Sequence, residues 1–195
     1  MLSLQLTDEG NARIFSTCAS IAILGVHEVF KINNLQYLGV WFAMQLFFAY
    51  LLIDSFMRNT KLPVDGIIHH AVGMLIVIFG SHKQYTNNQI YAYITPYLYM
   101  EVTTPFLHLA WIFHNEEVFM NKPLARIFFF ALIVLWIPFR LVYPTVNTYT
   151  IFFNSYFPIG TLTVSEKSFG APIFVAFNLL QFFWFGKLIE RLLRS

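Results

Sequence analysis

The sequence predicts an all-α integral membrane protein with six transmembrane helices. Three observations support this prediction: the composition, six apolar segments, and ionisable residues inside several of those segments. Of the 195 residues, 57% are hydrophobic and only 11% are charged, whereas about a quarter of the residues in a soluble domain are charged. A helix needs about 20 apolar residues to cross the roughly 30 Å hydrocarbon core. The chain therefore has room for a single transmembrane domain, residues 1–195, and no soluble one.

The apolar segments are separated by short polar or proline-containing connections. They cover about 14–30, 35–57, 64–81, 89–113, 123–143 and 171–189. The fourth and fifth are the clearest spans. The first is the weakest, because His27 and Glu28 directly follow its apolar part, which ends at Val26. A protein with five spans therefore stays open as an alternative.

The distribution of Lys and Arg in the connections predicts the orientation. With six spans, one side receives Arg13, Arg58, Lys61, Lys122, Arg126, Lys187, Arg191 and Arg194, and the other receives Lys31, Lys83 and Lys167. Because positive residues accumulate on the cytosolic side, we expect both termini in the cytosol. The segment before the first span has no basic start, so we expect that span to be retained rather than cleaved as a signal peptide.

The connection at roughly 144–170 is expected to be a partly interfacial loop on the far side. Pro138 and Pro144 should bend the end of the helix before it, since each removes a backbone donor. The net charge of +2 and the absence of Lys or Arg runs argue against a nucleic-acid partner. The single cysteine, Cys18, excludes an internal disulfide and is expected to be a small buried residue.

Ionisable residues occur inside four of the predicted spans. Asp54 lies in the second, His69 and His70 in the third, Glu101 in the fourth and Arg140 in the fifth. Such a residue costs roughly 2.5 kcal/mol or more at membrane depth, so it usually faces the bundle interior or a cavity. Asp54 has an alternative role, because a helix-end ion pair with Arg58 four residues later is available to it.

Further polar residues recur at helical spacing. On the fourth segment, intervals of three or four residues place Glu101, Thr104, His108 and Trp111 on one face. Asn178 and Gln181 form an amide pair on the sixth segment, and Gln45 lies near the middle of the second. Together these side chains could line a polar tunnel. Alternatively, they are interhelical hydrogen bonds of about 1 kcal/mol or less each.

The adjacent histidines cannot share one helical face, because neighbours in a helix point about 100° apart. One can face a cavity while the other braces it. Imidazole transfers protons near neutral pH and can also accept an acyl group. His69, His70, His108 and Glu101 could in principle hold a metal, but the chain has no HxxxH or HExxH pairing, the spacing at which zinc motifs put two ligands on one helical face. We expect no metal site.

Several of these residues, taken in order, resemble the TRAM–Lag–CLN (TLC) domain family over about residues 12–193. The resemblance is carried by Asp54, Lys61, the His69–His70 pair, the EVTTPFLH segment 101–108, Phe139-Arg140 with Pro144, and Asn178 to Phe185. The chain is most similar to the small TLC domain-containing proteins and more distantly to ceramide synthases. The resemblance implies six helices around a lipid-accepting cavity, usually in the endoplasmic reticulum.

For ceramide synthases, the resemblance also implies transfer of a fatty acyl group from acyl-CoA to the amine of a sphingoid base. The histidine pair would then lie at the catalytic centre. The chain departs from that pattern at one place. Synthases carry two acidic residues four and seven positions before the glutamate that matches Glu101, and this chain has Tyr97 and Ile94 there. That difference weakens the case for ceramide synthesis.

The leading hypothesis is therefore a protein of membrane lipid metabolism or lipid homeostasis that binds a long acyl chain. In its catalytic form it is an acyl-CoA-dependent acyltransferase with the active-site residues His69, His70, Glu101, Asp54 and His108. Arg58, Lys61 and Lys122 would attract the phosphates of acyl-CoA, a co-substrate rather than a permanently bound cofactor. Thr104, Trp111, Arg140, Asn178, Gln181 and Gln45 would line the cavity.

Two other classes stay open. A non-enzymatic lipid sensor, lipid organiser or escort of membrane proteins explains the missing acids better, and its partners would be a second copy or another membrane protein. A transporter would need paired half-helices and a conducting polar path. Pro96, Pro105 and Pro138 interrupt helices without forming such a pair.

Overall fold

A computed structural model describes residues 6–33, 35–57, 64–81, 94–153 and 162–194, and every regular element in these ranges is helical. The elements are α1 (Asp8–Ile32), α2 (Gln36–Met57), α3 (Val64–Ser81), the 3-10 helix η1 (Tyr99–Thr103), α5 (Thr104–Asn115), the 3-10 turn η2 (Glu117–Phe119), α6 (Lys122–Trp136), the π-helix η3 (Ile137–Val142), α7 (Tyr143–Phe152) and α8 (Val164–Arg194). The predicted all-α class is confirmed for this part of the chain.

Side chains at the helix starts explain where two of the long helices begin. Thr7 caps α1, because its hydroxyl accepts a hydrogen bond from the backbone N–H of Gly10. Asn121 caps α6 in the same way by accepting from the N–H of Leu124 at 3.0 Å. Proline lies in the first turn of α5 and of α6, where its missing N–H has no intrahelical partner to lose.

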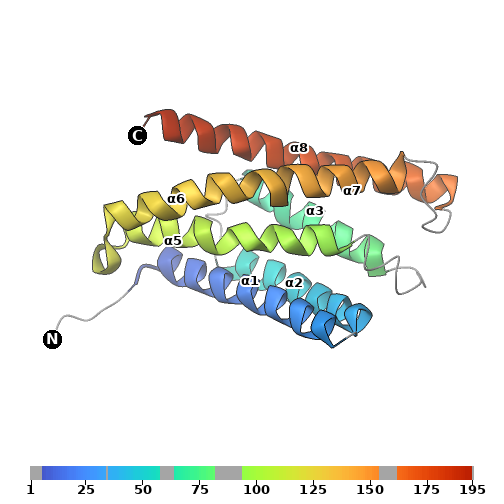
Figure 1. The fold of residues 1–195 in the computed structure, drawn as a ribbon, viewed down its shortest axis with the longest axis horizontal. Helices are drawn as coiled ribbons and strands as arrows, with labels where there is room; N and C mark the ends of the chain where they lie inside the picture. Colours follow the sequence, from blue (N-terminus) through green and yellow to red (C-terminus); the bar gives the residue numbers. More distant parts are fainter. Residues whose placement is uncertain (1–5, 34, 58–63, 82–93, 154–161, 195) are drawn as a thin grey trace.

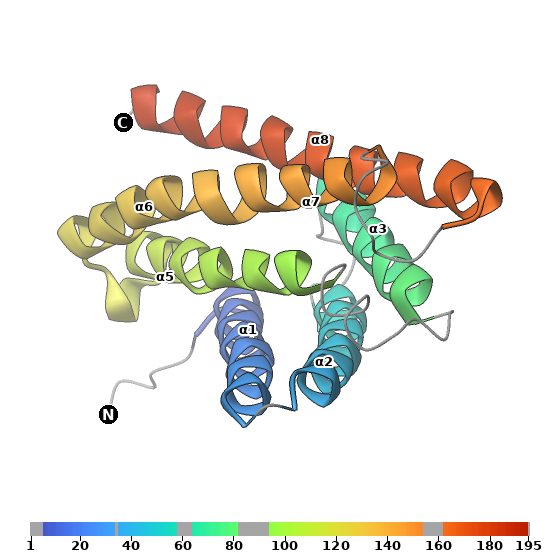
Figure 2. The ribbon, with the colours of Figure 1, turned by 45° about the vertical axis from the view of Figure 1, so that its right-hand side comes forward.

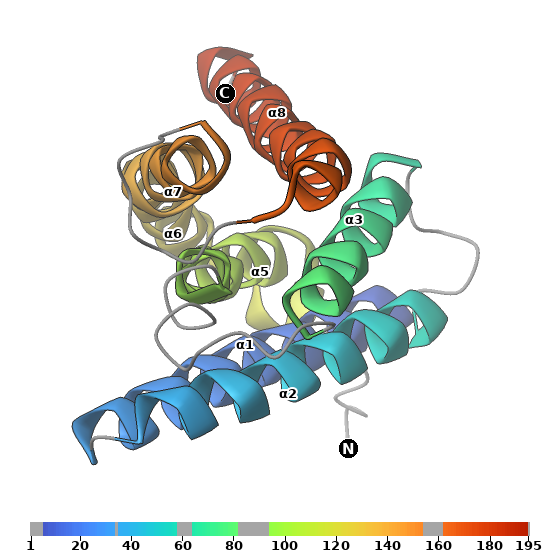
Figure 3. The same ribbon diagram turned by 90° about the vertical axis from the view of Figure 1, so that its right-hand side faces the viewer.

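The helices form a ring rather than a stack of layers. Along this ring α1 packs against α2, α2 against α3, and α3 against α8. The continuous helix α6–η3–α7 packs against α8 and, through α6, against α5, which returns to α1. Figure 3 shows the ring from one end, and Figure 2 shows that α1, α2 and α3 are inclined to the other helices. The described helices begin with α1 and finish with α8 at the same end of the bundle (Figure 1).

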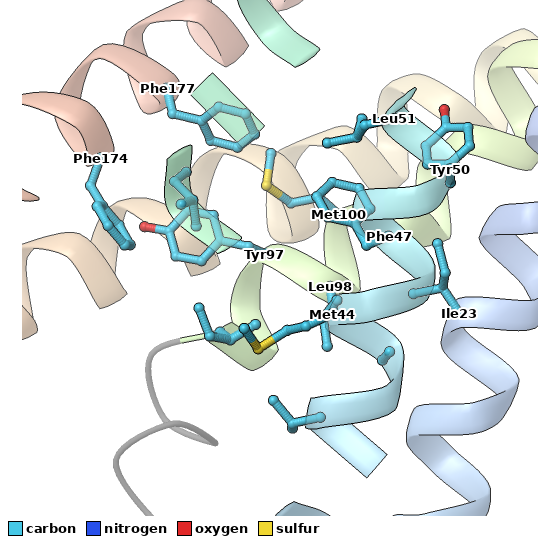
Figure 4. Packing of buried hydrophobic residues seen from close by; sticks show 14 of the residues in the cluster. Ile23, Met44, Phe47, Tyr50, Leu51, Tyr97, Leu98, Met100, Phe174 and Phe177 are labelled. Atoms are coloured by element: carbon cyan, nitrogen blue, oxygen red, sulfur yellow. The ribbon is translucent and has the colours of Figure 1, made fainter. Parts of the chain in front are cut away.

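The largest apolar cluster fills the ring in the half away from the termini. It joins α2, the segment before η1, and α8, through residues that include Met44, Phe47, Tyr97, Leu98 and Phe174 (Figure 4). Tyr97 contacts the Phe174 ring edge-on, with the ring centroids 5.1 Å apart. A second cluster lies between α5, α6 and α8 and is centred on Leu132 and Trp136. These two clusters hold the helices around the polar side chains described below.

Three helices are long and apolar enough to cross a membrane: Asp8–Ile32, Lys122–Phe152 and Lys167–Leu193. Shorter apolar helices cover Leu38–Asp54 and Gly66–Ile76. The first segment, which is the weakest in the sequence, is thus one of the three long apolar helices. Its capped start at Asp8 adds almost two turns to the expected span.

The expected interfacial loop begins later than the sequence indicated. Residues 144–152 and 164–170 are helical, so the prediction of a loop over about 144–170 is wrong for these parts. Pro138 does not end the helix either, because the chain passes it in a π-helical segment and continues as α7. Widening the turn in this way accommodates the missing backbone donor and the proline ring.

Two side chains lie on the outside, contrary to expectation. Gln45 is exposed on α2, so the prediction that it lines a cavity is wrong. The inner face of α2 is formed by Val40, Ala43, Met44, Phe47 and Leu51, and Gln45 lies on the opposite side with the exposed Trp41 and Leu52. Cys18 is also exposed rather than buried, because the inner face of α1 runs through Ser16 and Ser20.

Candidate functional site

His70 lies against a buried carboxylate. Its Nε2 atom is 3.5 Å from Oδ2 of Asp54 on α2, and Asp54 is only 1% exposed. The other carboxylate oxygen, Oδ1, accepts a hydrogen bond of 2.6 Å from the hydroxyl of Ser16 on α1. Three helices thus contribute to one arrangement in which Asp54 orients the imidazole. Asp54 therefore points into the bundle, and the position of Arg58 lies outside the described residues.

His69 points in a different direction, toward α8. Its ring stacks on Phe177 with a centroid separation of 5.2 Å and lies 4.8 Å from the ring of Trp184. Its Nδ1 atom is buried and has no hydrogen-bond partner among the described residues. The two histidine rings are 5.8 Å apart. One histidine is thus oriented by a carboxylate while its neighbour keeps an unpaired ring nitrogen in an aromatic setting.

Glu101 and His108 both face α1. Glu101 is 3% exposed, and its carboxylate accepts a hydrogen bond from the hydroxyl of Ser20. About two turns later, on α5, Nδ1 of His108 lies 3.2 Å from a guanidinium nitrogen of Arg13. The same guanidinium lies over the ring of Trp111, 4.4 Å from its centroid. α1 therefore supplies a partner for each polar residue on this side of the fourth segment.

Arg140 lies in the π-helix η3 and is 4% exposed. It donates hydrogen bonds to the hydroxyls of Thr103 and Thr104, the latter at 3.0 Å, and to Oε1 of Gln181 at 3.1 Å. Its guanidinium also lies over the Trp136 ring, 4.6 Å from the centroid. The charge is close enough to interact electrostatically with Glu101 and His69. Arg140 therefore links the fourth segment to α8.

Asn178 and Gln181 are both buried on α8 but do not pair with each other. Nδ2 of Asn178 donates to the hydroxyl of Thr148 at 2.7 Å, and that hydroxyl also bonds to Tyr97 at 2.7 Å. Oδ1 of Asn178 and Nε2 of Gln181 have no hydrogen-bond partner in the part of the chain that the structure describes. The sequence predicts an amide pair, whereas the structure shows that Asn178 and Gln181 make separate contacts on the inner face of α8.

The structure brings most of the candidate residues inside the ring. His70, Asp54, Glu101, His108, Thr104, Arg140, Asn178 and Gln181 are buried, whereas Trp111 is partly buried and Lys122 is exposed. The shared face on the fourth segment is only partly confirmed, because Thr104 turns to Arg140 while the other three residues turn to α1.

The partners of these residues were missed at the sequence level. Arg13, Ser16 and Ser20 each contact a candidate residue from α1, and Thr103 contacts Arg140. The spacing of Arg13, Ser16 and Ser20 at three and four residues contains the signal, because it places all three on one helical face. Lys61 lies outside the described residues. Within the described ranges, no three His, Cys, Asp or Glu residues gather closely enough to hold a metal ion.

Comparison with known proteins identifies the family. The family model described as TLC domain matches residues 13–190. The chain belongs to the TLC domain family. It is also similar to a TLC domain-containing protein of Acanthamoeba polyphaga mimivirus, with 28% identity over 157 residues that cover 78% of this chain and 72% of the relative. No solved structure matches the chain significantly. The resemblance seen in the sequence is thereby confirmed, and it makes this TLC protein a membrane protein with a lipid-related function.

Proposed function

We propose that this TLC protein crosses the endoplasmic reticulum membrane six times, with both termini cytosolic, and binds a long acyl chain inside the helix ring. We further propose that it transfers the acyl group from acyl-CoA to an amine in the manner of a ceramide synthase. The ring of helices and the shared end of α1 and α8 support an even number of crossings. The buried polar residues support a site inside the ring.

The observation that carries this proposal is the different environment of the two histidines. Asp54 fixes His70, whereas the neighbouring His69 keeps a buried, unpaired Nδ1 atom. A buried polar atom without a partner costs about 1–3 kcal/mol, so such atoms in a native interior often have a chemical role. An imidazole held by a carboxylate next to a second, unpaired imidazole is suited to proton transfer and nucleophilic attack.

The proposed reaction has two balanced steps. The unpaired nitrogen of His69 attacks the thioester carbonyl, forms an acyl-imidazole and releases the thiolate of coenzyme A. The amine then attacks the acyl-imidazole, an amide bond forms, and His69 leaves with its electron pair. His70, held by Asp54, takes the proton that the amine loses. Glu101 would stabilise positive charge that develops near its carboxylate. His108, which faces Arg13, would assist the reaction from the cytosolic end of the site.

The experiment is intact mass spectrometry of the purified protein before and after incubation with long-chain acyl-CoA. We expect a mass increase of one acyl group in the wild type and none in His69→Ala, with candidate long-chain amines discharging the acyl group. In His70→Ala we expect slower discharge. The control is His114→Ala, since His114 is exposed at the end of α5. Equal acylation of the wild type and His69→Ala would contradict the proposed nucleophile.

A second candidate function has a specific observation in its favour. The positions that carry acids in synthases are Ile94 and Tyr97, and both are buried in the apolar cluster, 2% and 4% exposed. A lipid sensor, a lipid organiser or an escort of membrane proteins needs an acyl-binding interior without those carboxylates. It predicts lipids that co-purify with the protein and no histidine-dependent acylation. The same mass measurement therefore separates the two candidates.

A further inference from the structure

The guanidinium of Arg140 is a buried charge whose described hydrogen-bond partners are all neutral. An arginine carries five N–H donors, and Arg140 directs three of them to Thr103, Thr104 and Gln181. None of the described carboxylates lies within ion-pair distance of Arg140, and Glu101 acts on it only through a longer-range electrostatic interaction. A buried charge without a counter-ion costs several kcal/mol. The arrangement therefore favours an anion beside Arg140.

Helix α8 places further unpaired polar atoms beside this guanidinium. Because arginine cannot accept a hydrogen bond, Gln181 must present its Oε1 atom, which leaves the Nε2 donor unpaired among the described residues. Asn178, one turn earlier, has an unpaired Oδ1 atom, and turning its amide over would leave Nδ2 unpaired instead. Both residues are 6% exposed or less. The Nε2 donor of Gln181 on α8 and the remaining N–H donors of Arg140 in η3 thus lie next to each other without acceptors among the described residues.

The surroundings of these polar atoms are apolar. Phe177 lies one turn before Gln181 on α8, and Trp184 lies one turn after it. Phe177 and Phe174 belong to the apolar cluster, in which Tyr97 and Met100 lie next to them (Figure 4). On the other side, the Trp136 ring covers the guanidinium. A ligand for this place therefore needs one small polar head and a long apolar body.

We propose that Arg140 and Gln181 bind the carboxylate of a long-chain fatty acid between η3 and α8. A planar carboxylate matches the two remaining N–H groups of a guanidinium and neutralises its single charge. The Nε2 atom of Gln181 donates to the same carboxylate. A fatty alcohol brings no charge, and a phosphate monoester brings a second charge that no described cation balances at this place. This site rests on the proposed acyl-binding interior but not on acyl transfer.

The first test is ligand selectivity of the full-length wild-type protein in nanodiscs. Binding of radiolabelled palmitate is measured in competition with hexadecanol, methyl palmitate and palmitoyl lysophosphatidic acid. We expect unlabelled palmitate to compete at least about tenfold better than the alcohol and the ester, which corresponds to about 1.4 kcal/mol. Equal competition by the alcohol or the ester would overturn a site built on charge. Stronger competition by lysophosphatidic acid would assign the site to phosphate instead.

The second test uses variants of the two donor residues. Arg140→Gln should weaken palmitate binding at least about tenfold, and Gln181→Leu should weaken it several-fold. The matched control is Arg126→Gln, because Arg126 is an exposed arginine on the same continuous helix. If Arg126→Gln weakens binding as much as Arg140→Gln, the effect is one of overall charge and the site is wrong. If Arg140→Gln does not fold, Gln181→Leu alone decides the outcome.

The two proposals can fail separately. Acylation of the wild type by acyl-CoA without saturable palmitate binding would overturn the carboxylate site and leave the acyl-transfer proposal standing. Saturable, Arg140-dependent palmitate binding in a protein that is never acylated would support the carboxylate site and reject the histidine chemistry. In that case the protein is a fatty-acid-binding membrane protein rather than a transferase.

Discussion

Buried polar groups have different hydrogen-bond partners on the two sides of the helix ring. On the side of α1, hydroxyl groups lie against the carboxylates of Asp54 and Glu101, and a guanidinium lies against His108. On the side of α8, Arg140, Gln181 and Asn178 form some bonds but keep unpaired donors and an unpaired acceptor. On the first side, these contacts join α1 to its neighbouring helices. The second side leaves the donors on which the proposed carboxylate site rests.

This contrast predicts that substitutions on the α1 side cost stability. The largest effect is expected for Asp54→Ala, which removes the acceptor of Ser16 and the carboxylate beside His70. We expect a loss of about 3 kcal/mol in the free energy of unfolding, since the hydrogen bond from Ser16 to the carboxylate and the contact of the carboxylate with His70 are lost together. Unfolding by SDS titration in mixed micelles measures it. A loss below about 1 kcal/mol would contradict the pairing role of Asp54.

The second-largest effect on stability is expected on the same side, where Gly10 of α1 lies close to Glu116. A Cβ atom on Gly10 would lie 2.4 Å from Oε1 of Glu116 and 2.8 Å from its Cδ. Glu116 is 3% exposed and accepts from the backbone N–H and the hydroxyl of Thr7, so it has little freedom to move. We expect Gly10→Ala to lower the free energy of unfolding by about 1–3 kcal/mol.

The matched control for Gly10→Ala is Gly25→Ala on the same helix. Nothing lies within 4 Å of a Cβ atom at Gly25. Alanine should therefore stabilise the protein by about 0.5–1 kcal/mol through helix propensity. Equal effects at the two glycines would show that α1 does not approach Glu116 closely.

A smaller loss is expected for Ser20→Ala, which removes the hydroxyl that donates to Glu101. The expected decrease is about 1–2 kcal/mol, because a buried carboxylate loses one neighbouring donor. A double-mutant cycle with Glu101→Gln measures the coupling of the pair. A coupling energy near zero would place Glu101 outside the stabilising side of the bundle.

The smallest effect on stability is expected on the α8 side. Asn178→Leu removes one bond to Thr148, but it also removes an amide atom that has no partner in the described structure. These contributions oppose each other, so we expect a change within about 1 kcal/mol. A stability loss as large as that of Asp54→Ala would remove the difference between the two sides.

The sequence predicts the fold class and most of the buried polar residues well, because membrane depth makes both easy to recognise. Composition and the length of the apolar segments are sufficient to predict an all-helical membrane protein. The cost of placing a charge in the membrane is sufficient to predict that Glu101 and Arg140 face the bundle interior. Which helix pairs with which is a tertiary property. The partners Ser16, Ser20 and Thr103 are small and neutral. The helical spacing of Ser16 and Ser20 shows that they share a face, but it does not show which helix that face contacts.

The prediction for Gln45 was wrong for a related reason. Its polarity suggested an inner position, but an amide on the outside of a helix costs far less than a charge there. The apolar residues of α2 are present on all sides of the helix, so their periodicity does not tell the inner face from the outer face. The different partners of Glu101 and Thr104 also escaped prediction, because spacing places two residues on one face but does not say which helix each side chain contacts.

The π-helix η3 affects the register of the whole continuous helix α6–η3–α7. Buried residues recur there every four positions, at Leu132, Trp136, Arg140, Pro144, Thr148 and Phe152. In a regular α-helix each such step drifts by about 40°, so five steps would turn the last residue to the opposite side. The wider turn of η3 takes back part of that drift. Deleting one residue within 137–142 would therefore rotate Thr148, with the rest of α7, away from Tyr97 and Asn178.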